Sequence, residues 1–158
     1  MESADTAADK AKKPSEEPQL VDNALSLALF IILFFLVANV SVLISAKVLN
    51  DAACTNAVAK AREGMMDGQR SEAVMHMAVS GVENTPTSFL VSMPQLTEFN
   101  YGTRNGKRAL RIATSALARI PAPFLMPNAP FNSDGQLQVS RAYEIEISPQ
   151  PVKKSGSK

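Results

Sequence analysis

The longest uncharged stretch of the chain, residues 23–46, limits its possible folds more than any other feature. It lies between Asp22 and Lys47, and its centre, residues 25–37, is almost purely apolar. Because an α-helix rises ~1.5 Å per residue, the stretch reaches roughly 36 Å, enough to cross a ~30 Å hydrocarbon core. Every backbone polar group must be satisfied internally in lipid, so we predict one transmembrane helix over residues 20–46.

A buried core helix and a cleaved signal peptide both fit this segment less well than a membrane anchor. A buried core helix needs a large fold around it, and the residues after 46 are too few and too polar for that. A cleaved signal peptide has an apolar region of ~7–15 residues behind a short basic segment. Here the apolar run is longer and follows a mixed-charge segment, and residues 44–46 match a cleavage site poorly. We therefore expect the helix to be retained as an anchor.

The charges that flank the helix do not set its orientation. Three lysines lie on the N-terminal side, and Lys47, Lys60 and Arg62 lie nearest on the other side. Because long domains translocate largely regardless of charge, we expect the short N-terminus to stay in the cytoplasm. The predicted location is the cytoplasmic (inner) membrane, with a single pass and an extracytoplasmic C-terminal domain.

The chain outside the span divides by composition. Residues 1–19 and 149–158 contain almost nothing to bury and are predicted to be disordered tails, the first one cytoplasmic. Residues 47–81 are predicted to form a helical stem and a second short helix. The stem would end near Glu63, with Gly64 as its cap and Gly68 as a second break, and the second helix, 71–79, would stop at Gly81.

Residues 82–148 are predicted to form a small antiparallel β domain. Short strand-like runs occur at 88–93, 96–101 and 108–114, and Asn105-Gly106 is a tight-turn dipeptide before the third run. From residue 137 to 147 apolar residues dominate the odd positions and polar residues the even ones, which is typical of a strand buried on one face. The predicted fold class is α+β: a long N-terminal helix with a small antiparallel sheet packed against its outer half.

Small and polar residues on the long helix are candidates for helix packing. Ala53, Ala57 and Ala61 recur every fourth residue, which allows another backbone to come close. They would pack either on the protein's own outer domain or on a partner helix. Asn39 and Ser41, in the second half of the span, would either hydrogen-bond a neighbouring helix or meet lipid headgroups.

A proline-rich loop separates the last two predicted strands. Four prolines between residues 120 and 131 exclude a regular helix or a central strand there. The large apolar side chains of this loop either tuck under the sheet or form a contact surface for a protein or the membrane; they are Phe124, Leu125, Met126 and Phe131.

The residues that usually carry chemistry are few. The chain has one histidine, His76, and one cysteine, Cys54, without spacing typical of a nucleophile–base pair or a metal site. We expect no enzyme activity, cofactor or metal, and a net charge of +1 predicts no nucleic-acid partner. Basic residues near the hairpin would keep it soluble or meet acidic lipid or a partner; they are Arg104, Lys107, Arg108 and Arg111.

Four stretches together resemble the TadE/TadG-like pilus-assembly proteins of bacterial tight-adherence (Flp-type) pilus systems. They are Val21-Asp22-Asn23-Ala24-Leu25 before the apolar run, the Ala-rich segment 56–64, the strand 110–114 with the loop 121–130, and the last strand 137–147. Asp22 stands where the family usually has Glu, and Asn23 replaces an aromatic residue. At the matching scissile bond Glu17 replaces the Gly that a prepilin peptidase normally needs, so processing is not expected.

The resemblance implies a pseudopilin-like membrane protein that helps to build or anchor a pilus. Its partners would be membrane lipid and other pilus or secretion-system proteins, with a homo- or hetero-oligomer formed through the helix. The alternative from the residues alone is a membrane-tethered module that binds a ligand or an envelope component with its sheet and loop 121–131.

Overall fold

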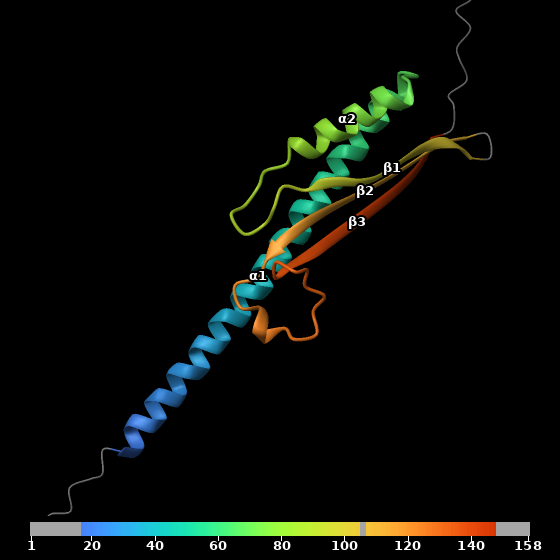
Figure 1. The fold of residues 1–158 in the computed structure, drawn as a ribbon. Helices are drawn as coiled ribbons and strands as arrows, with labels where there is room; N and C mark the ends of the chain where they lie inside the picture. Colours follow the sequence, from blue (N-terminus) through green and yellow to red (C-terminus); the bar gives the residue numbers. More distant parts are fainter. Residues whose placement is uncertain (1–16, 105–106, 148–158) are drawn as a thin grey trace, which may run out of the picture. The chain divides into compact units, whose positions relative to one another are not determined.

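The computed structural model describes residues 17–104 and 107–147, with side chains left undescribed at 17–20, 104 and 147. Its elements, in chain order, are α1 (Glu17–Met66), α2 (Ser71–Glu83), β1 (Gln95–Arg104), β2 (Lys107–Arg119), the 3-10 helix η1 (Pro123–Leu125) and β3 (Gln136–Ile147) (Figure 1). A long apolar N-terminal helix with a three-stranded antiparallel sheet confirms the predicted α+β class. The predicted tails lie almost wholly outside the described residues.

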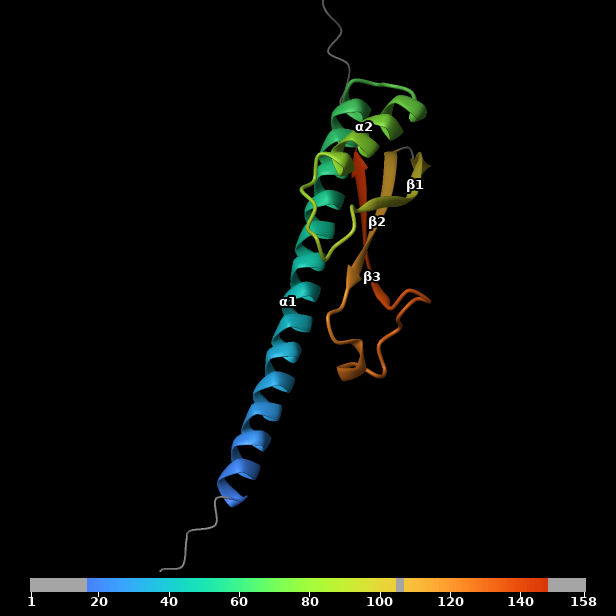
Figure 2. The same cartoon turned by 60° about the vertical axis from the view of Figure 1, so that its left-hand side comes forward.

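The chain divides into two compact units within α1, after Phe34, and we describe each by itself. The described part of the first unit consists of α1 up to Phe34. In the second unit, the remainder of α1 lies along one face of the sheet, with α2 beside its C-terminal end (Figure 2).

The sheet has the order β1-β2-β3, and both pairings are antiparallel. Arg104 pairs with Lys107, so residues 105 and 106 connect the two strands as the predicted hairpin requires, although they lie outside the described residues. A bulge between Leu96 and Glu98 shifts the register of β1, which places Leu96 and Phe99 on the same, half-buried face. β2 continues to Arg119, beyond the predicted end at 114, because β3 pairs with it over that whole length.

The prediction of a strand at 88–93 is wrong. This segment forms only isolated bridges, from Val91 to Ser88 and to Ala118. The N–H of Val91 donates to the carbonyl of Ser88, which turns the chain back on itself, and Pro94 follows directly. A turn of this kind cannot continue as a strand, whatever the strand propensity of its residues.

Both helices pass through the glycines expected to end them. α1 runs through Gly64 and ends before Gly68, whose φ of 71° is the left-handed conformation that glycine tolerates. α2 runs through Gly81 because the lack of a side chain there lets it approach α1 closely. A Cβ built on Gly81 would lie 2.7 Å from the carbonyl oxygen of Asn56 and 2.9 Å from Ala57 Cα.

The core consists of two apolar clusters along α1. The first joins Ala53, Cys54, Ala57, Ala61 and Met65 of α1 to Val74, Ala78 and Val82 of α2 and to Leu110 and Ile112 of β2. The second joins Val42 and Ala46 to Val91, Ala116, Ala118 and Ile120. Along β3 the half-buried side chains are at odd positions, as the alternation predicts; they are Leu137, Val139, Tyr143 and Ile145.

Candidate functional site: the apolar helix and its docking face

The N-terminal half of α1 is apolar and has almost no protein cover. Only 11% of its most apolar 18-residue window is buried, and α1 is long and apolar enough to cross a membrane. About a dozen large apolar side chains between Val21 and Val48 are at least 45% exposed. Keeping this surface in water would cost ~1 kcal/mol or more per side chain, so the segment needs an apolar surrounding that the described chain does not supply.

Protein cover begins at Asn39, inside the uncharged stretch. The side chain of Asn39 is buried: its Nδ2 donates to the carbonyl oxygen of Ala122 at 2.8 Å, and its Oδ1 accepts from the Ala122 N–H at 3.0 Å. These two hydrogen bonds to the backbone N–H and C=O of Ala122 hold the start of the proline-rich loop against α1. From the sequence, Asn39 was predicted to hydrogen-bond a neighbouring helix or to meet lipid headgroups. In the structure it hydrogen-bonds the protein's own loop instead.

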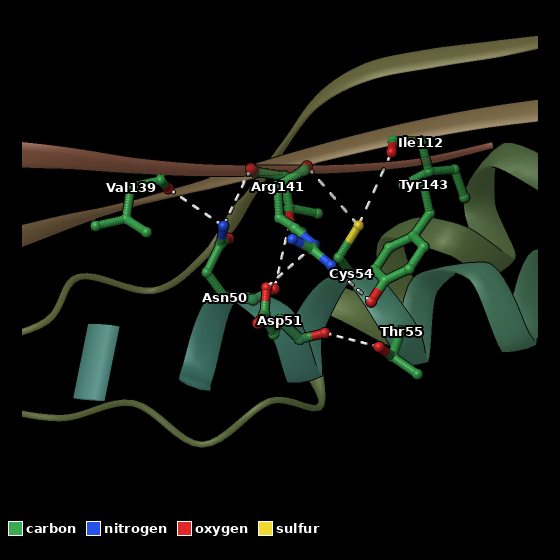
Figure 3. Close-up of polar contacts among 9 residues, drawn as sticks. Asn50, Asp51, Cys54, Thr55, Ile112, Val139, Arg141 and Tyr143 are labelled. Atoms are coloured by element: carbon green, nitrogen blue, oxygen red, sulfur yellow. Dashed lines mark hydrogen bonds and ion pairs between the residues drawn. The ribbon is translucent and has the colours of Figure 1, made fainter. Parts of the chain in front are cut away.

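Further along α1, Asn50 and Cys54 also contact backbone carbonyls of the sheet (Figure 3). Asn50 Nδ2 lies 3.3 Å from the carbonyl oxygen of Thr114 and 3.2 Å from that of Val139. Cys54 Sγ lies 3.8 Å from the carbonyl oxygens of both Ile112 and Arg141. Asn39, Asn50 and Cys54 thus serve as polar contacts on an otherwise apolar docking face.

The environment of Cys54 makes its thiol unreactive. Burial raises the pKa of the Cys54 thiol above its ordinary value, outweighing the hydrogen bond with Thr114 and the nearby charge of Arg141, which lower it. A buried, protonated thiol is a poor nucleophile and a poor metal ligand. We assign Cys54 a packing role.

An exposed ion pair lies beside these contacts (Figure 3). Arg141 Nε lies 3.4 Å from Asp51 Oδ1, and the guanidinium stacks 5.0 Å from the centroid of the Tyr143 ring. Arg141 is the one odd position in the middle of β3 whose side chain turns out to solvent. Exposed pairs of this kind contribute ~0–1 kcal/mol, so the pair adds orientation more than stability.

The other predicted packing residues on α1 fall into two groups. Ala53, Ala57 and Ala61 have no exposed surface and contact the protein's own α2 and sheet, the first of the two alternatives that the sequence allowed. Ser41 is exposed, and its hydroxyl donates to the Val37 carbonyl within the same helix.

Asp22 lies near the start of the described part of α1, in the first unit. Its side chain is exposed on the helix. It stands immediately before the uncharged stretch. The described residues assign it no contact that defines a role.

The four apolar residues of the proline-rich loop are not equivalent. Met126 and Phe131 are half-buried against the second cluster, and Leu125 is also half-buried. Phe124, in η1, is 72% exposed. Three of the four large apolar side chains are thus partly covered by the protein, and Phe124 is exposed.

The basic residues near the hairpin find partners within the chain. Lys107 pairs with Glu146 at 3.9 Å, and Arg111 with Glu98 at 3.1 Å. Arg108 Nη1 donates to the carbonyl oxygen of Met65 at 2.6 Å, which satisfies a group at the C-terminal end of α1. The side chain of Arg104 is not described. Three of the four residues thus act within the fold.

The outer face of the sheet has one shallow hollow, lined by residues such as Asn100, Arg111 and Glu144. Within the described ranges, no three His, Cys, Asp or Glu side chains gather in a way that could hold a metal ion.

Cys54 lies close to the stripe of small residues that the sequence indicates, whereas Asn50 is a docking residue that the sequence did not single out. Positions 39, 42, 46, 50, 53, 57 and 61 form one continuous stripe at helical spacing, and this spacing could have identified Asn50. Comparison of the chain with known protein families, curated proteins and solved structures finds no match.

Proposed function

We propose that this protein is a single-pass structural or assembly component, pseudopilin-like, of a bacterial tight-adherence pilus or a related secretion apparatus. The observation that carries the proposal is the difference in side-chain exposure along α1. Residues 24–38 carry almost only apolar side chains, most of them exposed, whereas the stripe from Asn39 to Met65 is covered by the protein's own domain. The bare part suits lipid and neighbouring membrane helices, and the domain suits contacts outside the membrane.

Packing within the second unit supports retention of the helix as an anchor. Removal of the chain up to Ala46, as by signal cleavage, would take Val42 and Ala46 out of the second cluster and Asn39 away from Ala122. It would expose apolar residues of the sheet and take the hydrogen bond of Asn39 from the buried N–H of Ala122, each a cost of ~1–3 kcal/mol. A domain that uses these residues as core is better served by an uncleaved helix.

Assembly through the membrane would use large side chains rather than the small-residue stripe. The alanines are already buried within the protein, so lateral contacts would be made by exposed residues such as Phe30, Leu33 and Val37. The N-terminus would face the cytoplasm and the domain the outside, where pilus or secretion-system proteins would be its partners. The family resemblance in the four sequence stretches directs the proposal to the tight-adherence system.

The test uses single cysteines in membranes, in a Cys54→Ala background. Oxidative crosslinking of cysteines placed one at a time over residues 21–38 should give adducts on one helical face, with partners identified by mass spectrometry as pilus or secretion proteins. A cysteine at the buried Ala57 serves as a matched control and should give none. Extraction of the whole protein by alkaline carbonate, or equal crosslinking at all positions, would contradict the proposal.

A tethered binding module is the second candidate, and the hollow on the outer sheet face favours it. Asn100 and Arg111 offer hydrogen-bond donors there, open to solvent. In the host, Asn100→Ala with unchanged pilus assembly but impaired retention of an envelope component would support binding. Loss of surface pili on deletion of the whole chain, with full rescue by Asn100→Ala, would support assembly.

A further inference from the structure

The proline-rich loop presents one aromatic side chain from an uncharged surface. Residues 120–133 contain no Asp, Glu, Lys or Arg. Phe124 is 72% exposed, and with Phe89 it is one of the two most exposed aromatic side chains among the described residues. Solvent exposure forfeits most of the ~1.5–3 kcal/mol that burial of a Phe side chain contributes, so Phe124 lacks an apolar partner.

The level of this loop along α1 identifies the surface that it meets. Ala122 is held by Asn39, and Phe124 follows two residues later. In the same unit, α1 presents exposed apolar side chains on both sides of Asn39, namely Leu36, Val37, Val40 and Ile44. Lys47, the first charged residue after Asp22, lies about 12 Å farther along the helix axis than Asn39. Phe124 therefore lies level with the apolar part of α1 and not with the part that begins at Lys47.

The length of the bare helix agrees with this placement. A ~30 Å hydrocarbon core takes about 20 helical residues, so a span that begins after Asp22 ends a few residues beyond Asn39. The loop begins to cover α1 where the hydrocarbon core would end. Lys47 and Arg119 are exposed cations beyond that level, and cations there suit acidic headgroups. Two ion pairs of the sheet, Lys107–Glu146 and Arg111–Glu98, lie toward the hairpin, at its other end.

We propose that the loop after β2 inserts Phe124 into the lipid at the membrane–water boundary, so that the domain is seated on the bilayer. The partner is the lipid surface itself, at the junction of headgroups and acyl chains. Segments that lie at the membrane surface bury apolar side chains, Phe among them, at the boundary between headgroups and acyl chains. This inference rests on the proposed membrane insertion of α1 and adds a second membrane contact to it.

The chain has no tryptophan, so Phe124→Trp introduces a single fluorescent probe. The full-length variant is reconstituted in phosphatidylcholine vesicles, with and without brominated acyl chains. We expect blue-shifted emission that brominated lipid largely quenches and that aqueous acrylamide hardly quenches. The matched control is Phe89→Trp, in a loop bonded to Leu117 and Arg119 of the sheet, where we expect red-shifted emission and the opposite quenching pattern.

Each outcome has a distinct meaning. Strong acrylamide quenching of Phe124→Trp in a chain that resists alkaline carbonate extraction overturns the lipid contact and leaves the proposed anchor intact. Blue-shifted emission without quenching by brominated lipid also overturns it, because it shows burial against protein, either a second copy or another chain. Complete extraction by carbonate is a failure of the proposed function instead. Because Phe124 is exposed, unchanged circular dichroism is expected and verifies that the variant folds.

Discussion

Substitution of Gly81 by alanine tests the contact between α2 and α1. A Cβ at this position would lie 2.7 Å from the Asn56 carbonyl oxygen and 2.9 Å from both the N and Cα atoms of Ala57. All three are backbone atoms of α1, so no side-chain rotation can relieve the overlap. Either the two helices separate by some tenths of an ångström, or α2 tilts away from the core.

Two opposing effects decide the sign of the change in stability. Alanine in a helix interior is favoured over glycine by ~1 kcal/mol, which stabilises the variant. Overpacking of a well-packed core costs ~1–3 kcal/mol, and a backbone obstacle places Gly81 toward the upper end of that range. We therefore expect Gly81→Ala to lower the free energy of unfolding of the second unit by ~1–2 kcal/mol.

Gly64→Ala is the matched control, because Gly64 is also buried inside a helix at the same interface. The closest atom to its added Cβ is Met77 Sδ at 2.8 Å, and the next is Val74 Cγ2 at 3.4 Å. The methionine side chain is flexible and can move aside at little cost. The gain in helix propensity then remains, and Gly64→Ala should be neutral or stabilising by up to ~1 kcal/mol.

Thermal unfolding of both variants in detergent micelles, followed by circular dichroism, measures the difference. At about 4 °C per kcal/mol, Gly81→Ala should unfold roughly 4–8 °C below the wild type and Gly64→Ala at or slightly above it. The shared Gly→Ala change cancels the effect on the unfolded chain. Equal unfolding temperatures for the two variants would refute the close contact of α2 with α1 at Ala57.

Three further changes test the docking face. Asn39→Ala should cost ~1–3 kcal/mol because the buried N–H of Ala122 loses its hydrogen bond, although the Ala122 carbonyl still accepts from the Leu125 N–H, and it should speed chymotryptic cleavage in the loop. Ser41→Ala, which loses only an exposed bond within α1, should be cleaved at the wild-type rate. Ala61→Leu should cost ~1–3 kcal/mol, because Ala61 is fully buried and the site has no room for three more carbon atoms. The exposed Ala59→Leu is the control and should cost less than ~0.5 kcal/mol. Similar unfolding temperatures for the two variants would show that the stripe is not packed. Burial raises the pKa of the Cys54 thiol, so at high pH the thiol releases its proton when the protein unfolds. The free energy of unfolding should therefore be independent of this thiol below its ordinary pKa of ~8.5 and should fall as the pH rises above that value. Maleimide labelling of Cys54 at neutral pH should accordingly be slow until denaturant is added, and rapid native labelling would argue against the buried position.

Local features of the sequence were enough to predict the helix, the hairpin and the last strand. An uncharged run longer than a bilayer core has few stable conformations other than a helix, because its backbone must pair with itself. The alternation from Leu137 to Ile145 reflects the two-residue repeat of a strand, which holds whatever the partner strand is. The tight turn predicted at 105–106, which lies outside the described residues, likewise rests on local backbone preferences, and the pairing of Arg104 with Lys107 agrees with the prediction.

Contacts between distant residues decided the rest. The spacing of the small residues showed that something packs closely on α1, but only the folded chain shows that α2 and the sheet do so, and that Asn39 pairs with Ala122. Gly81 resembles a helix stop in sequence and is a contact point in the structure, because a missing side chain permits both. Residues 88–93 have strand propensity, yet the turn at Val91 prevents a regular strand from forming there. In each case the free energy comes from partners far apart in the sequence, and a local pattern shows which residues can make a contact but not which contact they make.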